Sequence, residues 1–467
     1  MKKHLIILFL VSAAVRIVFA LVFDTAMPHY GMSYHYAELA YMVASGNGYG
    51  RIGGAESTDE TLKNFSWELA KEGEKINPTT ELPFELEKIV PEDFRPPAYP
   101  YFLAGIYRLF GEPLFLYATL IQALLGAFLP VVIFFTAKKL FGQDIAVCAA
   151  WLSAFYPPLI FIQLQPLADP FQVFFIMLAL FCFICGTDEK LNFFWLSLSG
   201  AAIGIGYLFR VEIFLLIPVF CLLLFYLFRF SLRTLKGIAV VLVCCAIFIG
   251  PWVVWTHQKT GYWYLASGSG MAAWLGIAER ENKWGAVLDD WHAEGLVRAQ
   301  GYDFGQGPAA DRWFKKRVAA AFKEEPAFFL ISAIQRIPQV IAPPFFWGYE
   351  NPQRTKGFYS YFRLKENLNF YQIIFRNKTY ILKAFWDRLL IALISLLAAI
   401  SMIFIVCQYR SFPKKVILFL SIPLSFIIAR ICIRVVEHLM VLLLPFQLIA
   451  LAVLLVEIRR LFSRQRV

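Results

Sequence analysis

Long apolar runs alternate with polar connectors along this sequence. A helix needs about 20 consecutive apolar residues to cross a bilayer, and most of the runs reach or approach that length. The runs cover residues 5–23, 114–137, 145–163, 169–186, 191–208, 213–228, 237–255, 386–407, 416–432 and 439–456. They predict an all-α polytopic membrane protein with about ten transmembrane helices. Because no clear small-residue cleavage site follows the first run, we expect it to remain as a span.

Two long polar stretches interrupt the pattern, at residues 24–112 and 256–385. We interpret them as two large extracytoplasmic loops, the second with amphipathic helices. They divide the chain into an N-terminal transmembrane module at 1–255, which includes the first loop, the second loop at 256–385, and C-terminal transmembrane helices at 386–467.

Composition and charge agree with a membrane protein. The chain is 59% hydrophobic and only 16% charged, with a mean hydropathy of +0.60, which excludes an ordinary soluble domain. Most of the net charge of +11 lies in short connectors, so it indicates membrane orientation and no nucleic-acid partner. The basic residues of these connectors are Lys2, Lys3, Lys138, Lys139, Lys190, Arg229, Arg233, Lys236, Arg410, Lys414, Lys415, Arg459, Arg460, Arg464 and Arg466. Ten spans place them on one side, which predicts an inner-membrane protein with both termini cytoplasmic and an extracytoplasmic active face.

Within the loops, local patterns predict further helices. Residues 37–44 have helical periodicity beside closely spaced tyrosines, which favours an amphipathic helix at the membrane surface. Residues 51–95 are rich in Glu and Lys and suggest an exposed insertion. Residues 311–329 suggest a surface helix whose basic residues anchor it to lipid head groups or bind a lipid phosphate.

Three carboxylates lie at membrane boundaries on the predicted loop side. They are Asp169, Glu212 and Glu437. Ionisable groups at the ends of spans are costly to bury, so their convergence on one face suggests a site. For Asp169 an alternative is open, because Asp followed by Pro is also a good helix start.

Several short motifs, taken in order, resemble those of one family. The stretches that carry the resemblance are Arg16, Tyr36–Tyr49, Arg95–Ala104 with Leu109–Gly111, Leu167–Pro170, Phe209–Glu212, Pro251–Trp252 and Glu437–Phe446. Together they resemble the GT-C superfamily of integral-membrane glycosyltransferases, especially the bacterial relatives of dolichyl-phosphate-mannose-protein mannosyltransferases and the aminoarabinose transferase of lipid A.

The resemblance implies a reaction. A sugar on a polyprenyl phosphate passes to a glycan, lipid or protein acceptor at the outer face of the cytoplasmic membrane. Where the family carries an Asp in the first loop, this chain has Met32, which can neither accept a proton nor bind a hard metal ion. Three explanations stay open: the base is a nearby group, the motif is aligned a few residues off, or the protein binds a lipid-linked saccharide without catalysis.

Transfer from a polyprenyl phosphate needs a base for the acceptor hydroxyl and positive charge for the departing phosphate. The candidate catalytic residues are Asp169, Glu38, His35 and Asp24. The candidate substrate-binding residues are Arg95, Tyr99, Arg210, Glu212, Tyr36, Glu437 and His438. Arg95 and Arg210 suit forked contacts to phosphate, although Arg210 could simply pair with Glu212. We expect no organic cofactor, and the question of a divalent metal is left open.

Overall fold

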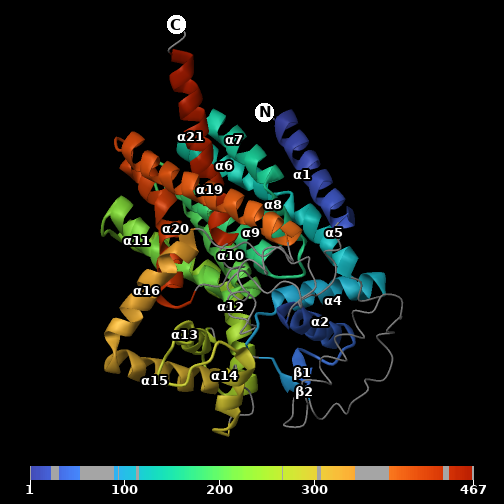
Figure 1. The fold of residues 1–467 in the computed structure, drawn as a ribbon. Coiled ribbons are helices and arrows are strands. Elements are labelled where there is room, and N and C mark those ends of the chain that lie inside the picture. Colours follow the sequence, from blue (N-terminus) through green and yellow to red (C-terminus); the bar gives the residue numbers. More distant parts are fainter. Residues whose placement is uncertain are drawn as a thin grey trace.

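The fold is a helical membrane body with helical loops on one side (Figure 1). The computed structural model describes residues 2–22, 31–52, 89–92, 94–111, 115–265, 267–301, 307–341, 378–434 and 441–464. Within these residues one two-stranded ribbon accompanies the helices. The all-α polytopic class predicted from hydropathy is confirmed.

Helices cover every predicted span, but not all of them are long enough to cross a bilayer. Among the described residues, seven segments meet the length and hydropathy of a span. They are α1 (Lys2–Val22), α5 (Phe115–Gly126) with α6 (Leu129–Phe141), α9 (Asp169–Gly186), η2 (Val211–Leu215) with α11 (Leu216–Phe228), α12 (Leu232–Thr260), α20 (Pro413–Cys432) and α21 (Leu444–Arg464). A bent pair, α7 (Gln143–Phe155) and α8 (Pro157–Leu164), gives an eighth. The remaining predicted runs lie in α10 (Phe193–Phe209) and α19 (Lys378–Gln408), whose apolar helical segments are shorter, so the number ten is not confirmed.

The bend between α7 and α8 explains a buried arginine. The two helices meet at 54° where Pro157 and Pro158 begin α8. Proline has no N–H, so a continuous helix could not satisfy the carbonyls of Ser153 and Ala154 four residues earlier. The guanidinium of Arg16, which is fully buried, donates to these carbonyls at 3.5 and 3.3 Å. It also donates to Gln163 Oε1 and to Ser12, so α1 is fixed against the break.

Replacing Arg16 with methionine is therefore expected to destabilise the protein. The change leaves buried carbonyls without donors, and each such group costs about 1–3 kcal/mol. A thermal unfolding scan in detergent should show a clearly lower midpoint. The matched control is Lys3→Met in the same helix, where the side chain is exposed; an equal loss of stability in the control would contradict the assignment.

The first loop supplies a helix and a short ribbon. The helix α2 (Gly31–Ala44) is followed by β1 (Gly50–Ile52), which pairs antiparallel with β2 (Ile89–Pro91), and α4 (Ala98–Phe110) packs on α2. Residues 36–42 of α2 are all buried, so the predicted amphipathic helix at the membrane surface is wrong here. A helix enclosed on all sides needs no polar face. Most of the predicted insertion at 51–95 lies outside the described residues.

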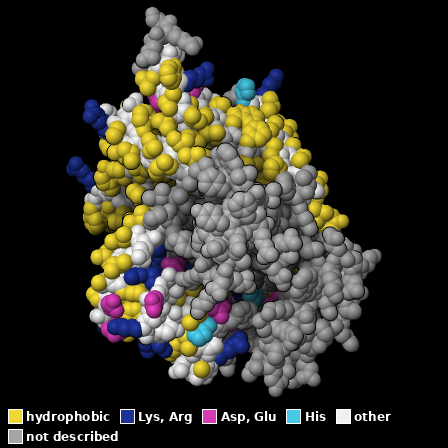
Figure 2. Space-filling view, viewed as in Figure 1, with side chains coloured by type: hydrophobic (Ala, Val, Ile, Leu, Met, Phe, Trp, Pro, Cys, Tyr) yellow, Lys and Arg dark blue, Asp and Glu magenta, His cyan; other side chains and the backbone are white. Residues whose placement is uncertain are grey.

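The second loop forms a small helical unit with its own apolar core. Its helices are α13 (Ser269–Ile277), α14 (Asp290–Arg298), α15 (Pro308–Glu324) and α16 (Pro326–Ile341). Trp274 and Phe314 are fully buried at its centre. The surface helix predicted at 311–329 is two helices, because Pro326 starts a new one. In Figure 1 this unit lies opposite the chain ends, and Figure 2 shows charged side chains gathered over it below the hydrophobic surface of the spans.

Arg336 of α16 joins this unit to the membrane body. Its guanidinium lies 2.6 Å from Glu279 Oε2 and donates to the carbonyls of Gly276 (2.7 Å) and Ile431 (3.0 Å). Gly276 must lack a side chain, because a Cβ there would lie 2.1 Å from the carbonyl oxygen of Ile433. The end of α20 is therefore held directly against the second loop.

We expect Gly276→Ala to separate the second loop from α20. Such overpacking against backbone typically costs about 1–3 kcal/mol. Limited proteolysis should cut the second loop faster, and the thermal midpoint should fall. Gly295→Ala in α14 is the control, since a Cβ there meets nothing within 4 Å. If both variants behave like the wild type, the close approach at Gly276 does not hold the loop.

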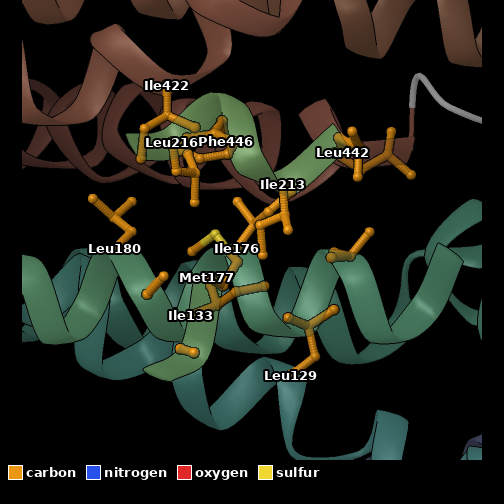
Figure 3. Packing of buried hydrophobic residues seen from close by; sticks show 14 of the residues in the cluster. Leu129, Ile133, Ile176, Met177, Leu180, Ile213, Leu216, Ile422, Leu442 and Phe446 are labelled. Carbon is orange, nitrogen blue, oxygen red and sulfur yellow. The ribbon is translucent and has the colours of Figure 1, made fainter. Parts of the chain in front are cut away.

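The apolar core of the membrane body packs against the start of η2. Figure 3 shows Ile176 and Met177 of α9 facing Ile213 of η2, with Phe446 of α21 across from them. All four side chains are almost fully buried. The start of η2 is thus held by side chains from several spans.

The opposite side gathers the predicted basic connectors. Lys139 lies 2.9 Å from Asp188, Lys414 donates to the carbonyls of Thr187 and Asp188, and Arg460 lies 2.8 Å from Asp144. The start of α1 and the end of α21 lie on this same side in Figure 1.

Candidate functional site

Two carboxylates and two guanidiniums meet at the loop side of the membrane body. Asp169 is the first residue of α9, and Arg210 is the extended residue that joins α10 to η2. Arg210 lies between Asp169 and Glu212, with nitrogen–oxygen distances of 3.5 and 3.6 Å. Arg430, from the last turn of α20, lies 3.7 Å from the other oxygen of Glu212. We call Asp169, Arg210, Glu212 and Arg430 the carboxylate–guanidinium cluster.

Local sequence places these groups. Pro170 at the second position of α9 suits a helix start, and Asp169 therefore sits at the very end of the span. The backbone of Arg210 is extended between two helices, so its side chain projects toward α9. Gln172 lies three residues after Asp169, on the same helix face, and its amide donates to Glu212 at 3.5 Å.

The two carboxylates differ in accessibility. The side chain of Asp169 is fully buried, and no other residue described here donates a hydrogen bond to its oxygens. Its partner is Arg210, so the helix-cap interpretation does not describe its contacts. Glu212 keeps 28% of its side chain exposed. Glu212 is therefore the carboxylate of the cluster that a substrate can reach.

Tyr36 connects the first loop to the cluster. Its hydroxyl accepts a hydrogen bond from Arg210, and its ring packs edge-on against Tyr99 at 5.0 Å. Burial raises the pKa of Tyr36, which keeps the phenol neutral. Burial alone would lower the pKa of Arg210, but Asp169 and Glu212 outweigh it and raise that pKa above its ordinary value, so the guanidinium stays charged.

Arg95 is fixed beside this group by the end of the first loop. Glu92 Oε1 accepts from the backbone N–H groups of Phe94 and Arg95 at 2.9 and 2.8 Å, and Glu92 Oε2 lies 3.7 Å from the Arg95 guanidinium. Tyr49 donates its hydroxyl to the carbonyl of Arg95 at 3.0 Å. These contacts hold the positive charge of Arg95 near Tyr36. The charge of Arg95 lowers the pKa of Tyr36 and so offsets part of the rise that burial causes.

The remaining candidates have different positions. His35 Nδ1 lies 3.8 Å from Glu38 Oε2 on α2, and the side chain of Glu38 is buried. Tyr99 is buried and donates to Gln122 Oε1 at 3.2 Å. Asp24, Glu437 and His438 lie outside the described residues, as does the side chain of Met32.

Sequence reasoning missed part of the cluster. Arg430 is the only charged residue between Lys415 and the end of α20, and such an isolated charge in a span is itself a signal of function. Gln172 and Glu92 carried no recognisable signal. Among the described residues, no three His, Cys, Asp or Glu side chains gather as a metal donor set.

The comparisons with known proteins bear on this fold. A family model described as dolichyl-phosphate-mannose-protein mannosyltransferase matches residues 94–255, which contain Arg95, Asp169, Arg210 and Glu212. The structure of the oligosaccharyltransferase AglB of Archaeoglobus fulgidus, in complex with an inhibitory peptide and a dolichol-phosphate, aligns over 99% of this chain with a TM-score of 0.50 and 13% identity. The alignment shows that the chain shares its fold with this oligosaccharyltransferase, and the family model covers the part of the chain that holds most of the cluster.

The chain spans only 51% of the length of the archaeal oligosaccharyltransferase. ArnT of Cupriavidus metallidurans bound to undecaprenyl phosphate aligns over 96% of this chain and 85% of its own, with 13% identity and a TM-score of 0.41. The sequence matches none of the curated proteins.

Proposed function

We propose that this protein is a membrane glycosyltransferase that moves a sugar from a polyprenyl phosphate to an acceptor hydroxyl. The reaction takes place at the extracytoplasmic face of the cytoplasmic membrane, with both chain ends on the cytoplasmic side. The observation that carries the proposal is the carboxylate–guanidinium cluster, which offers both charges that this chemistry needs at the loop-side ends of three different helical segments. The GT-C fold and the dolichol-phosphate in the AglB structure agree with a lipid-linked donor.

The proposed mechanism begins with exchange of ion pairs. A donor phosphate that enters beside Arg210 and Arg430 competes with Glu212 for both guanidiniums. Arginine suits this task because its planar fork matches phosphate oxygens. Asp169 stays buried against Arg210 and keeps the guanidinium oriented, so we assign it a positioning role in this mechanism.

Once the phosphate holds the guanidiniums, the Glu212 carboxylate is free to act as base. The acceptor oxygen attacks the anomeric carbon, the bond between that carbon and the phosphate oxygen breaks, and the electron pair leaves with the phosphate. The acceptor proton passes to Glu212. Arg210 and Arg430 stabilise the charge that develops on the departing phosphate.

A transfer assay tests the proposal. Membranes that contain the protein are given radiolabelled polyprenyl-phosphate sugars, and label is followed into endogenous lipids, glycans and proteins. We expect label in an acceptor fraction that membranes without the protein lack. Binding of the donor without any transfer would instead support the second candidate, a non-catalytic GT-C protein that binds a lipid-linked saccharide.

The second candidate rests on one residue. Met32 stands where the resemblance leads us to expect an acid, and its position in the first turn of α2 is four residues before Tyr36. Met32→Asp separates the two candidates: a gain in transfer indicates a catalyst with a displaced or weakened base, whereas binding that is unchanged with no transfer favours the non-catalytic protein.

A further inference from the structure

The helix α16 has its apolar face turned outward. Leu330, Ile331 and Ile334 are 64%, 44% and 56% exposed, whereas the polar side chains of Ser332 and Arg336 are buried. A helix facing water shows the reverse arrangement, and an outward apolar face is typical of contact with lipid. In Figure 1, α16 runs from α15 toward α20, that is, from the loop side toward the spans.

An apolar crevice lies beside this helix, and the exposed Leu330 is among the residues that line it. It has a volume of about 820 Å³ and is bounded by α13, α15, α16 and the end of α20. Its walls are mainly apolar, with Ile277, Val318, Phe322 and Phe329 among them. Ile433, which directly follows α20, also lines it. We call it the α15–α16 pocket. No residue of the carboxylate–guanidinium cluster lines it, so it is a separate cavity.

Basic groups border the pocket. Lys315 and Lys323, two turns apart on α15, lie at its edge, and Arg336 lies on its α16 wall. Lys315 pairs with Asp311 at 2.6 Å and Arg336 with Glu279, while Lys323 is exposed and forms no ion pair with another described residue. The apolar walls suit an acyl chain, and the positive charge beside them suits an anionic head group. The position at the end of a span would bring both within reach of a membrane lipid.

We propose that the α15–α16 pocket binds an acyl chain of an anionic bilayer phospholipid, with its phosphate beside Lys323 and Lys315. The lipid would fill the gap between the second loop and α20, next to the Arg336 junction. This inference goes beyond the transferase proposal and does not depend on it, because it concerns a cavity that the proposed chemistry does not use.

Photolabelling of the purified full-length protein tests the site. The protein is placed in nanodiscs of phosphatidylcholine that contain a small share of phosphatidylglycerol with a diazirine in its acyl chain. After illumination, labelled peptides are mapped by mass spectrometry. We expect label on α15, on α16 and at the end of α20.

Two neighbouring alanines provide a matched pair of variants. Ala319 lines the pocket, whereas Ala320 does not, and both are exposed. Ala319→Trp should lower labelling at these positions about tenfold, equivalent to ~1.4 kcal/mol of binding, because the indole occupies the space of the chain. Ala320→Trp should leave labelling unchanged. Equal labelling of the two variants would overturn the proposal.

The head group and the competing lipid are tested separately. Lys323→Gln, an exposed change that leaves the packing intact, should reduce labelling by phosphatidylglycerol but not by the matching phosphatidylcholine probe. Labelling that unlabelled polyprenyl phosphate displaces, and unlabelled phosphatidylglycerol does not, would show that the pocket holds the tail of the donor and would contradict the assignment to a bilayer phospholipid.

Discussion

Arg210→Gln is expected to lower the rate of sugar transfer strongly and to destabilise the protein at the same time. The change leaves Asp169 as a buried carboxylate without its guanidinium, and breaking a buried pair in this way typically costs about 3–5 kcal/mol. It also removes one of the two cations that face the departing phosphate. Transfer should fall by about 10²–10³-fold, the usual effect of losing one group that stabilises transition-state charge.

A double variant separates these two effects. Arg210→Gln with Asp169→Asn replaces both charges of the buried pair with neutral amides, so no unpaired charge is left buried. The thermal midpoint should therefore recover while transfer stays low. Melting curves and transfer rates of the two single variants and the double variant complete the cycle. Recovery of transfer together with stability would show that the pair is purely structural.

Glu212→Gln is the second change with a large expected effect. Glu212 takes the proton of the acceptor hydroxyl in the proposed mechanism, and the Gln amide of the variant cannot do so. The rate of transfer should therefore fall about 10²–10⁴-fold. Because Glu212 is partly exposed, folding should be affected much less than by Arg210→Gln. Because the guanidiniums that bind the donor phosphate remain, the variant should still bind the donor. The loss should therefore appear in the rate at saturating donor.

The control for this experiment is Glu281→Gln. Glu281 is an exposed carboxylate of the second loop, so the same chemical change there should leave transfer and stability unchanged. A Glu212 variant that retains full transfer would remove Glu212 as the base and turn attention to Glu38 and His35 on α2.

The membrane architecture could be predicted from the sequence because a membrane span is recognised by its length and its apolar composition. A helix in lipid must be long and apolar, and each predicted run lies on a helix. The burial of α2 could not be read in this way. Its residues 36–42 look like a surface helix with tyrosines, but α4 and β1 pack on this helix and these residues are buried.

Part of the site was predictable and part was not. Asp169 and Glu212 both stand at loop-side ends of spans, so orientation alone brought them to one face. Their accessibility depends on tertiary structure: Arg210 covers Asp169 and leaves Glu212 partly open. Arg430 lies 218 residues after Glu212 in the sequence, and no local pattern indicates that α20 brings its guanidinium to that carboxylate.

The same holds for Arg16. Its charge lies in the first predicted span, and the carbonyls that it satisfies belong to the proline break between α7 and α8, more than a hundred residues away. Sequence patterns show which residues are costly to bury, whereas the partner that compensates each one depends on how the helices pack.

The most direct measurement follows the phosphate of the donor in a purified system. The protein in nanodiscs is given a polyprenyl-phosphate sugar and an acceptor fraction from the transfer assay, and ³¹P NMR monitors the phosphodiester. We expect wild-type protein to convert it to a phosphomonoester in step with sugar transfer, and the stable Arg210→Gln, Asp169→Asn variant to leave it intact. Equal conversion by both proteins would contradict the central claim that this cluster carries the reaction.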